Sequence, residues 1–341
     1  MTSIPLRAEA SRSWQQQLRD AIRTPRELAR ALHLEPSQLG FSAQADGDFA
    51  MKVPRRFVDR MQRGNVNDPL LRQVLAGASE TALHPEYSDD PVGETGAANP
   101  VPGIIHKYHG RLLMTVASGC AVNCRYCFRR HFPYAENQLS RSEWQDAVDY
   151  IEADASIAEV ILSGGDPLVT RDDYLSGLVD ALSTVPHVTT LRIHTRLPVV
   201  IPDRVTPGLL EAICRPGLST IVVLHSNHPN EIDATVAAAA ARLRAANITL
   251  LNQSVLLAGV NDCAETLAEL SRSLFNAGIM PYYLHLLDRV RGAAHFAVDE
   301  TRARKLAGEL AVQCPGYLVP RLVRETSGEG SKRGLTPRYP H

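Results

Sequence analysis

The chain predicts an α/β fold in which a partial (β/α)6 barrel follows a helical extension and precedes a short C-terminal segment. From residue 111 onward, short apolar runs rich in β-branched residues alternate with helical patterns, which is typical of parallel strands covered by helices. The first 83 residues have helical patterns only, and 341 residues with 44% hydrophobic side chains suffice for one large core. We therefore expect an extension over 1–83, a connecting segment over 84–110, a barrel over 111–316 and a final segment over 317–341.

The extension and the connecting segment differ in pattern. An amphipathic helix is expected over 14–22, and a third helix over 69–76. Between them, Thr24-Pro-Arg-Glu27 is a capping box with proline at the first helical position, which predicts a helix over 24–32. Residues 84–109 are rich in Pro, Gly and acidic side chains without a period, so we expect an irregular connection there.

The barrel region predicts six βα units. The expected strands are 112–117, 160–163, 190–194, 220–225, 248–255 and 282–287. The expected helices are 141–154, opened by a capping box at 140–143, and 172–184, 207–214, 231–246, 264–276 and 300–312. Since parallel barrels carry their chemistry at the C-terminal ends of the strands, the residues that follow each strand are the candidates for function.

Composition excludes several classes of function. The formal net charge is −1, which argues against nucleic acid or an anionic surface as the partner. No apolar stretch approaches the roughly 20 residues of a bilayer span, and residues 1–7 lack the apolar core of a signal peptide. We therefore expect a cytoplasmic protein that acts on a small molecule. Cys214, Cys263 and Cys314 fall on or just beside expected helices, where reduced, half-buried thiols are usual.

Three cysteines follow the first strand of the barrel. Cys120, Cys124 and Cys127 have the spacing C-x3-C-x2-C within one loop. Three thiolates can hold three irons of a [4Fe–4S] cluster and leave the fourth iron open for the amino and carboxylate groups of S-adenosylmethionine. A zinc site needs a fourth ligand, for which His131 is the near candidate, and a disulfide would leave one thiol over. The spacing favours the open cluster and resembles the signature of the radical SAM superfamily.

Polar residues also follow the other strands. Gly164 and Gly165 let a ligand approach the backbone after the second strand, and Asp166 can receive an ammonium group. Further polar groups follow the next three strands: Arg192, His194, Arg196, His225, His228, Asn252, Gln253 and Ser254. Each alone is typical of a rim residue, but together they predict one shared polar cavity.

Five motifs extend the resemblance to a family. Residues 100–108 (PVPGIIHKY), 228–232 (HPNEI), 250–257 (LLNQSVLL), 280–283 (MPYY) and 292–296 (GAAHF) resemble lysine 2,3-aminomutase, and the likeness covers about residues 84–335. The resemblance implies a radical SAM barrel whose C-terminal segment holds pyridoxal 5′-phosphate. It also implies an isomerase that converts L-α-lysine to (R)-β-lysine by a 1,2-amino migration.

The same resemblance implies a role for particular residues. Lys332, in the sequence Gly328-Glu-Gly-Ser-Lys332, would form the imine with pyridoxal phosphate. Arg129 would pair with the substrate carboxylate, and Asp288 and Glu325 would bind its distal ammonium, with Glu325 standing where the family has aspartate. The implied cofactor-binding residues are Lys332, Tyr108 and Arg111 for pyridoxal phosphate, with Gly164, Gly165, Asp166, His225 and Gln253 completing the set.

The choice of Lys332 has some independent support. A lysine in a Gly/Ser-rich tail is ordinarily a solvated surface residue. However, only four of the 36 basic residues are lysines, namely Lys52, Lys107, Lys305 and Lys332. Lys332 has the most flexible predicted backbone of the four, which suits imine exchange.

Residues 14–22 and 324–332 resemble the EpmB subgroup, which makes (R)-β-lysine for attachment to elongation factor P by a separate ligase. This implies as partners lysine, an electron donor protein and the elongation factor P ligase system, in a homo-oligomer. Cys263 matches one zinc ligand of the clostridial-type enzymes without its partners, so we expect no zinc.

Several alternatives stay open at the level of the sequence. One is a free-standing lysine or glutamate 2,3-aminomutase, although glutamate would require a cation where Asp288 and Glu325 lie. Another is a radical SAM enzyme without pyridoxal phosphate. A third, from a different class, is a non-catalytic metal-binding module.

Overall fold

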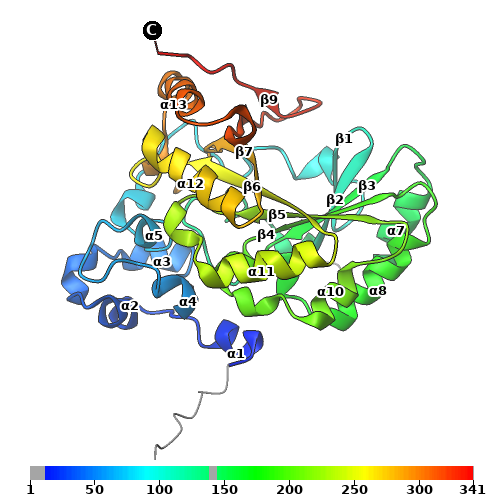
Figure 1. Cartoon of the computed structure of the whole chain (residues 1–341), viewed down its shortest axis with the longest axis horizontal. Coiled ribbons are helices and arrows are strands. Elements are labelled where there is room, and N and C mark those ends of the chain that lie inside the picture. Colours follow the sequence, from blue (N-terminus) through cyan, green and yellow to red (C-terminus); the bar gives the residue numbers. More distant parts are fainter. Residues whose placement is uncertain (1–11, 138–143, 341) are drawn as a thin grey trace, which may run out of the picture.

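The computed structural model describes residues 12–137 and 144–340, and within them nine strands form one sheet (Figure 1). The strands follow the order of the sequence; β2 to β8 run parallel, while β1 and β9 pair antiparallel at the two ends. The sheet is an open, partial barrel. The strands are β1 (Ile104–Tyr108), β2 (Arg111–Ala117), β3 (Glu159–Gly164), β4 (Thr190–Thr195), β5 (Ser219–His225), β6 (Thr249–Leu256), β7 (Met280–Leu286), β8 (Arg321–Arg324) and β9 (Arg333–Gly334).

The six expected barrel strands are confirmed as β2 to β7, with ends that differ by no more than two residues. Three strands were not expected. β1 lies in the segment predicted to be irregular, where the turn at Gly110 returns the chain antiparallel onto β2. β8 has the sequence Arg-Leu-Val-Arg, which is too short and too basic to show a strand pattern, and β9 has only two residues.

Helices follow the parallel strands and cover their outer side (Figure 1). Their bounds agree closely with the expected ones, and the capping box expected at 140–143 lies outside the described residues. The helices of the six βα units are α7 (Trp144–Glu152), α8 (Asp172–Ser183), α9 (Leu197–Val200) with α10 (Pro207–Ile213), α11 (Ala234–Ala245), α12 (Ala264–Asn276) and α13 (Glu300–Gln313).

The two faces of β4 and β6 differ in burial. Along β4 and β6, every second residue is buried, while the residues between them are partly buried or, at the start of β6, exposed. Arg192, His194 and Gln253 are among those partly buried residues, and they line a cavity. The interior of this barrel is therefore hollow, whereas small closed barrels fill it with side chains.

The N-terminal extension consists of short helices: α1 (Trp14–Arg19), α2 (Pro25–Leu32), α3 (Ala43–Asp48), α4 (Arg55–Val58) and α5 (Pro69–Arg72). The Thr24 hydroxyl caps α2 by accepting from the Glu27 amide at 3.3 Å, as the capping box predicts. The helix expected over 69–76 ends early, at Arg72. Side chains of the extension such as Ile22 and Phe57 belong to the same buried apolar cluster as Leu162 of β3, so the extension packs directly on the barrel.

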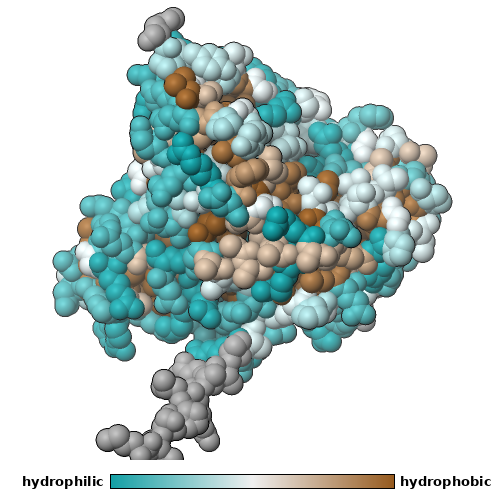
Figure 2. Space-filling model, viewed as in Figure 1, coloured by the Kyte–Doolittle hydropathy of each residue, from teal (hydrophilic) through white to brown (hydrophobic). Residues whose placement is uncertain are grey.

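The surface is largely hydrophilic over the N-terminal helices, and Figure 2 shows a paler, more apolar stripe along the alanine-rich α11. None of the helices in the described parts of the chain combines the length and the hydropathy that a bilayer span requires.

Candidate active site

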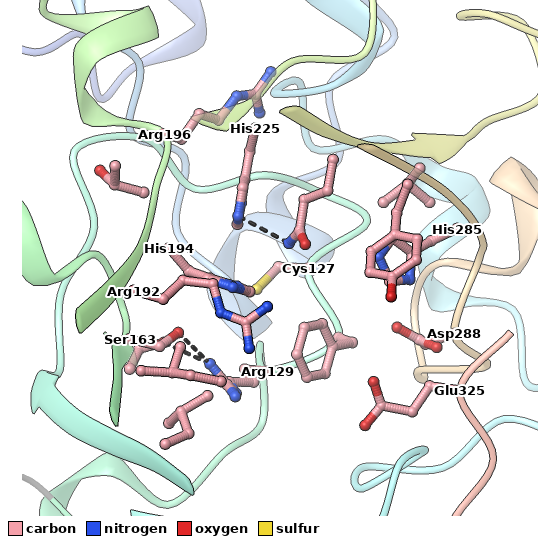
Figure 3. Close-up of a pocket in the computed structure, with 18 of the residues that line it drawn as sticks. Cys127, Arg129, Ser163, Arg192, His194, Arg196, His225, His285, Asp288 and Glu325 are labelled. Carbon is pink, nitrogen blue, oxygen red and sulfur yellow. Dashed lines mark hydrogen bonds between the residues drawn. The ribbon is translucent and has the colours of Figure 1, made fainter. Parts of the chain in front are cut away.

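A cavity of about 610 Å³ occupies the barrel interior (Figure 3). This volume is within the usual range for cofactor and substrate pockets. Every residue to which the resemblance assigns a role lines it: Tyr108, Arg111, Cys120, Cys124, Cys127, Arg129, Gly164, Gly165, Asp166, His225, Gln253, Asp288, Glu325 and Lys332. The expectation of one shared cavity is wrong for His228, Asn252 and Ser254, which do not line it, since Asn252 and Ser254 are buried on the opposite face of β6. The structure thus brings together side chains from all seven parallel strands and from the loops that follow them.

The loop after β2 carries the three cysteines. Burial is the main cause that raises the pKa of the Cys127 thiol to about 11, and the neighbouring Cys124 adds to it. Burial likewise raises the pKa of Cys120 well above its ordinary value, with Cys127 and Asp166 contributing. The three sulfurs are therefore close enough that a negative charge on one disfavours a negative charge on the others. Thiolates at these positions would need a bound cation to stabilise them.

In the described residues, no group of three or more His, Cys, Asp and Glu side chains is arranged around the position of a single metal ion. Three thiols that face a cavity fit the wider spacing of an iron–sulfur cluster. Cys263 lies apart from them at the start of α12, where its sulfur contacts the Thr266 hydroxyl at 3.0 Å.

The N-terminal extension holds this loop through its backbone. The Lys52 ammonium donates to the carbonyl of Cys120 at 2.5 Å, and the Lys52 carbonyl accepts from the Asn123 amide at 3.0 Å. Arg125, which is fully buried, donates to both oxygens of Glu80 at 2.8 and 2.6 Å. Sequence reasoning missed this contact, because Glu80 and Arg125 lie 45 residues apart.

The turn after β3 approaches the cysteine loop closely. A Cβ atom at Gly165 would lie 2.4 Å from the carbonyl oxygen of Gly119. Gly164 has a φ of +115°, and a Cβ there would lie 2.4 Å from the carbonyl oxygen of Ala117. Both positions therefore need glycine so that the turn can lie against the cysteine loop.

The carboxylate of Asp166 is bound within the protein. It accepts from the Thr195 hydroxyl at 2.6 Å and from the backbone amides of Arg196 and Leu197 at 2.8 and 3.0 Å. A fourth hydrogen bond comes from the Leu168 amide at 3.0 Å. These four donors occupy the positions that an ammonium would use, so the observed contacts of Asp166 tie the β3 turn to the end of β4.

Arg129 is also bound within the protein. Its guanidinium donates to both oxygens of Glu94, at 2.6 and 2.7 Å, and to the Ser163 hydroxyl at 2.8 Å. Both partners of the ion pair are buried. Glu94 comes from the connecting segment, and its carboxylate lies where the sequence predicted that of the substrate.

Basic and aromatic side chains also line the cavity. The Arg111 guanidinium lies over the Tyr108 ring at 4.7 Å, and Arg192 pairs with Glu159 at 2.8 Å. Burial is the main cause that lowers the pKa of both His225 and His285 to about 3, so both rings are neutral at pH 7. The Nε2 atoms of His194 and His285 have no hydrogen-bond partner among the described residues, and these residues line the cavity.

Lys332 lies in an ion-pair cluster. Its ammonium and that of Lys107 both donate to the carboxylate of Glu325, one to each oxygen. Burial acts to raise the pKa of Glu325, but the two ammonium groups hold it well below its usual range. Asp288 lies nearby, and burial, followed by the charge of Glu325, raises its pKa to about 7. Figure 3 shows Asp288 and Glu325 side by side.

Lys107 is a cavity residue that the sequence analysis did not select. Its place in a segment predicted to be irregular hid its position on β1, yet it is one of only four lysines and directly precedes Tyr108. Its rarity and this neighbour were the signals that could have found it.

The residues present fit the groups that the motifs imply. The cysteine loop offers three sulfur donors beside a glycine cradle, which suits an iron–sulfur cluster with an adjacent ligand. Lys332 offers a primary amine, and Arg111, Arg192 and the unpartnered histidine nitrogens offer groups for an anionic, heteroaromatic cofactor.

Comparisons with known proteins agree with this geometry. Residues 114–271 match the sequence model of the Radical SAM superfamily. The chain is 50% identical to the L-lysine 2,3-aminomutase of Escherichia coli and 49% identical to that of Haemophilus influenzae, over 97% and 94% of each chain respectively. It is 33% identical to the L-lysine 2,3-aminomutase of Clostridium subterminale, over 96% of this chain and 78% of that one. The chain is therefore a radical SAM isomerase that belongs to the lysine 2,3-aminomutase family.

Proposed function

We propose that the protein converts L-α-lysine to (R)-β-lysine by a 1,2-amino migration, with a [4Fe–4S] cluster on Cys120, Cys124 and Cys127 and pyridoxal phosphate on Lys332. The observation that carries the proposal is that one cavity is lined both by the three thiols and by the Lys332 amine. An amino migration that uses both a radical SAM cluster and pyridoxal phosphate requires the two groups within reach of one substrate.

The chain's own residues then bind lysine at its two ends. Arg129 offers a planar fork for the α-carboxylate, and Asp288 with Glu325 offers negative charge for the distal ammonium. In Figure 3 these two groups lie apart, as the two ends of an extended amino acid require. A glutamate substrate would place its distal carboxylate against Asp288 and Glu325, so like charges disfavour it.

Other residues position the cofactors. Tyr108, Arg111 and Lys107 line the side of the cavity near Lys332, where they would hold the phosphate and ring of pyridoxal phosphate. The Gly164–Gly165 turn would present its backbone to S-adenosylmethionine, and Asp166 would fix that turn rather than bind the ligand's amine. His225, bonded to Gln253 at 2.9 Å, would be a neutral partner for S-adenosylmethionine.

When bound, the cluster with S-adenosylmethionine supplies a hydrogen-abstracting radical, and pyridoxal phosphate supplies a conjugated ring that delocalises the unpaired electron. The protein supplies placement in a recessed cavity, which would limit the access of water to the reacting atoms. Glu325 accepts a hydrogen bond from the ammonium of Lys332 in the structure. It would form this ion pair again whenever the amine is released from the cofactor.

We further propose that the β-lysine serves the modification of elongation factor P in the cytoplasm. The support is the likeness of residues 14–22 and 324–332 to the EpmB subgroup. A low-potential electron donor protein and the elongation factor P ligase system would then be the partners, and the homo-oligomer remains part of the same proposal.

The test is an anaerobic assay of the reconstituted protein with S-adenosylmethionine, pyridoxal phosphate, dithionite and either lysine or glutamate, followed by chiral analysis of the product. We expect (R)-β-lysine from lysine and no product from glutamate. Lys332→Ala should lose both the imine absorbance and the activity, whereas Lys305→Ala, on the exposed face of α13, should keep both. Activity retained in Lys332→Ala would contradict the proposal. When the ligase and elongation factor P are added, the β-lysine should be attached to elongation factor P. Mass spectrometry should then show the mass of elongation factor P increased by one β-lysine residue.

A further inference from the structure

We propose that Arg196 tunes the iron–sulfur cluster: its guanidinium donates a hydrogen bond to the sulfur of Cys124 and makes the cluster easier to reduce. This inference rests on the proposed function, since it takes Cys124 as a ligand of the cluster. Arg196 directly follows β4 and is 5% exposed, and its Nη1 lies 2.7 Å from the Cys124 sulfur. In Figure 3 it lies apart from Asp288 and Glu325.

The guanidinium is fixed in this position from several directions. Its Nη2 donates to Gln73 Oε1 at 2.7 Å and to Glu231 Oε2 at 3.0 Å. The rings of Phe57 and Tyr126 lie 5.1 and 5.8 Å from its central carbon, which adds cation–π attraction. The side chain therefore cannot turn away from the sulfur without breaking buried contacts.

The partners of Arg196 are themselves held. Glu231 is fully buried, and its Oε1 accepts from the Gln73 side-chain amide at 3.1 Å and from the Asn227 backbone amide at 3.0 Å. The Asn227 side-chain amide donates to Gln73 Oε1 at 3.0 Å. Since Gln73 belongs to the extension and Glu231 follows β5, the donor to Cys124 is oriented by segments far apart in the sequence.

The sign of the electrostatic effect follows from the charges. When the cluster takes one electron from an external low-potential donor, negative charge increases on its irons and sulfurs. A cationic N–H donor beside one sulfur stabilises that reduced state more than the oxidised state, and the effect is strong in a buried site. Removal of Arg196 should therefore make the potential more negative. Glu231 partly neutralises Arg196, so its removal should make the potential more positive.

The test is a redox titration of the full-length, anaerobically reconstituted protein, followed by electron paramagnetic resonance of the reduced cluster. At the potential that half-reduces the wild type, we expect Arg196→Gln to lower the ratio of reduced to oxidised cluster by about tenfold. Loss of a residue that hydrogen-bonds a metal ligand changes metal affinity or activity by about 10- to 100-fold, and we take the lower value for the ratio. For a one-electron couple this corresponds to a shift of about 59 mV to more negative potential. Arg196→Lys, which keeps the charge, should shift less, and Glu231→Gln should shift in the opposite direction.

A matched control is Arg204→Gln. Arg204 is also fully buried, and it donates to the Leu168 carbonyl at 2.7 Å and pairs with Asp172. The Arg204→Gln variant should lower the free energy of unfolding about as much as Arg196→Gln does, but leave the reduction potential of the cluster unchanged. Opposite shifts in the Arg196 and Glu231 variants would support the proposal, because a structural disturbance has no reason to reverse its sign.

The proposal is overturned if Arg196→Gln and Arg196→Lys bind full iron and titrate at the wild-type potential. It is also overturned if Arg204→Gln shifts the potential as much as Arg196→Gln does, or if the Arg196 and Glu231 variants shift in the same direction. The ligand assignment is tested separately by the iron content of Cys124→Ala, since full iron and an unchanged signal there would contradict the proposed function itself.

Discussion

The guanidinium of Arg129 is held by the carboxylate of Glu94 through two parallel hydrogen bonds, Nε to Oε2 at 2.6 Å and Nη2 to Oε1 at 2.7 Å. This is the geometry in which arginine recognises a carboxylate. Under the proposed function, Arg129 would hold the α-carboxylate of lysine in the same way, and the substrate would then share or displace this ion pair.

Arg129→Lys should raise the KM for lysine, because an ammonium cannot form the two parallel hydrogen bonds. The loss of a hydrogen bond to a charged group costs about 1.5–3 kcal/mol, which is about 10- to 100-fold in affinity. Steady-state kinetics at varied lysine concentration measures this. The matched control is Glu94→Gln, which breaks the same buried pair but keeps the arginine fork. An equal rise of KM in Glu94→Gln would mean that Arg129 acts only through the pair.

Lysine binding should depend on pH through Asp288. Its pKa is raised to about 7 by burial and by Glu325, so the carboxyl is protonated below pH 7 and cannot attract the substrate's ammonium. We expect the affinity for lysine to rise between pH 6 and pH 8. Asp288→Asn should weaken binding and abolish this rise with pH. Equilibrium binding of lysine at fixed ionic strength measures this pH dependence. The same pH dependence in Asp288→Asn would contradict its assignment to Asp288.

The same pKa predicts an effect on stability. Because the folded chain binds the Asp288 proton more tightly than the unfolded chain, where the pKa is about 3.8, this group's contribution to the free energy of unfolding falls as pH rises from about 4 to 7. Asp288→Asn should remove that part of the pH dependence. Urea unfolding of the wild type and the variant at pH 5 and pH 7 measures the difference, and parallel pH profiles would contradict it.

Glu325→Gln should weaken lysine binding while keeping the size of the side chain. The variant removes the negative charge that pairs with Lys107 and Lys332 and that is proposed to receive the substrate's ammonium. The expected loss in affinity is about 10- to 100-fold, as for other hydrogen bonds to charged groups. Glu329→Gln, four residues further along the same segment, is the matched control and should bind lysine normally. Equal binding by both variants would rule out this role for Glu325.

The sequence predicted β2 to β7 because each is a short, largely apolar run between helical patterns, and local pattern suffices for such elements. It did not predict β8, since Arg321 and Arg324 flank only two apolar residues. Candidate ligands were found where they share a short motif, as Cys120, Cys124 and Cys127 do.

Contacts across the fold could not be predicted in the same way. The partners Glu94 and Arg129 lie 35 residues apart, and Gln73 and Arg196 lie 123 apart. Nothing in the local sequence of either residue specifies the other. For the same reason, Asp166 was expected to face a ligand, while its four hydrogen bonds within the protein depend on where the end of β4 lies.

Gly165→Ala should disturb the cysteine loop. An added Cβ would lie 2.4 Å from the Gly119 carbonyl oxygen and 2.9 Å from the Gly119 nitrogen, and backbone atoms cannot move aside without displacing Cys120. Overpacking of this kind costs about 1–3 kcal/mol. We therefore expect a lower thermal midpoint and less iron bound per chain after reconstitution. In Gly47→Ala, the matched control on α3, the added Cβ meets nothing within 4 Å, so iron content should stay normal and the helix should gain slightly in stability. A Gly165→Ala protein with full iron content and the wild-type thermal midpoint would contradict the close contact between Gly165 and Gly119.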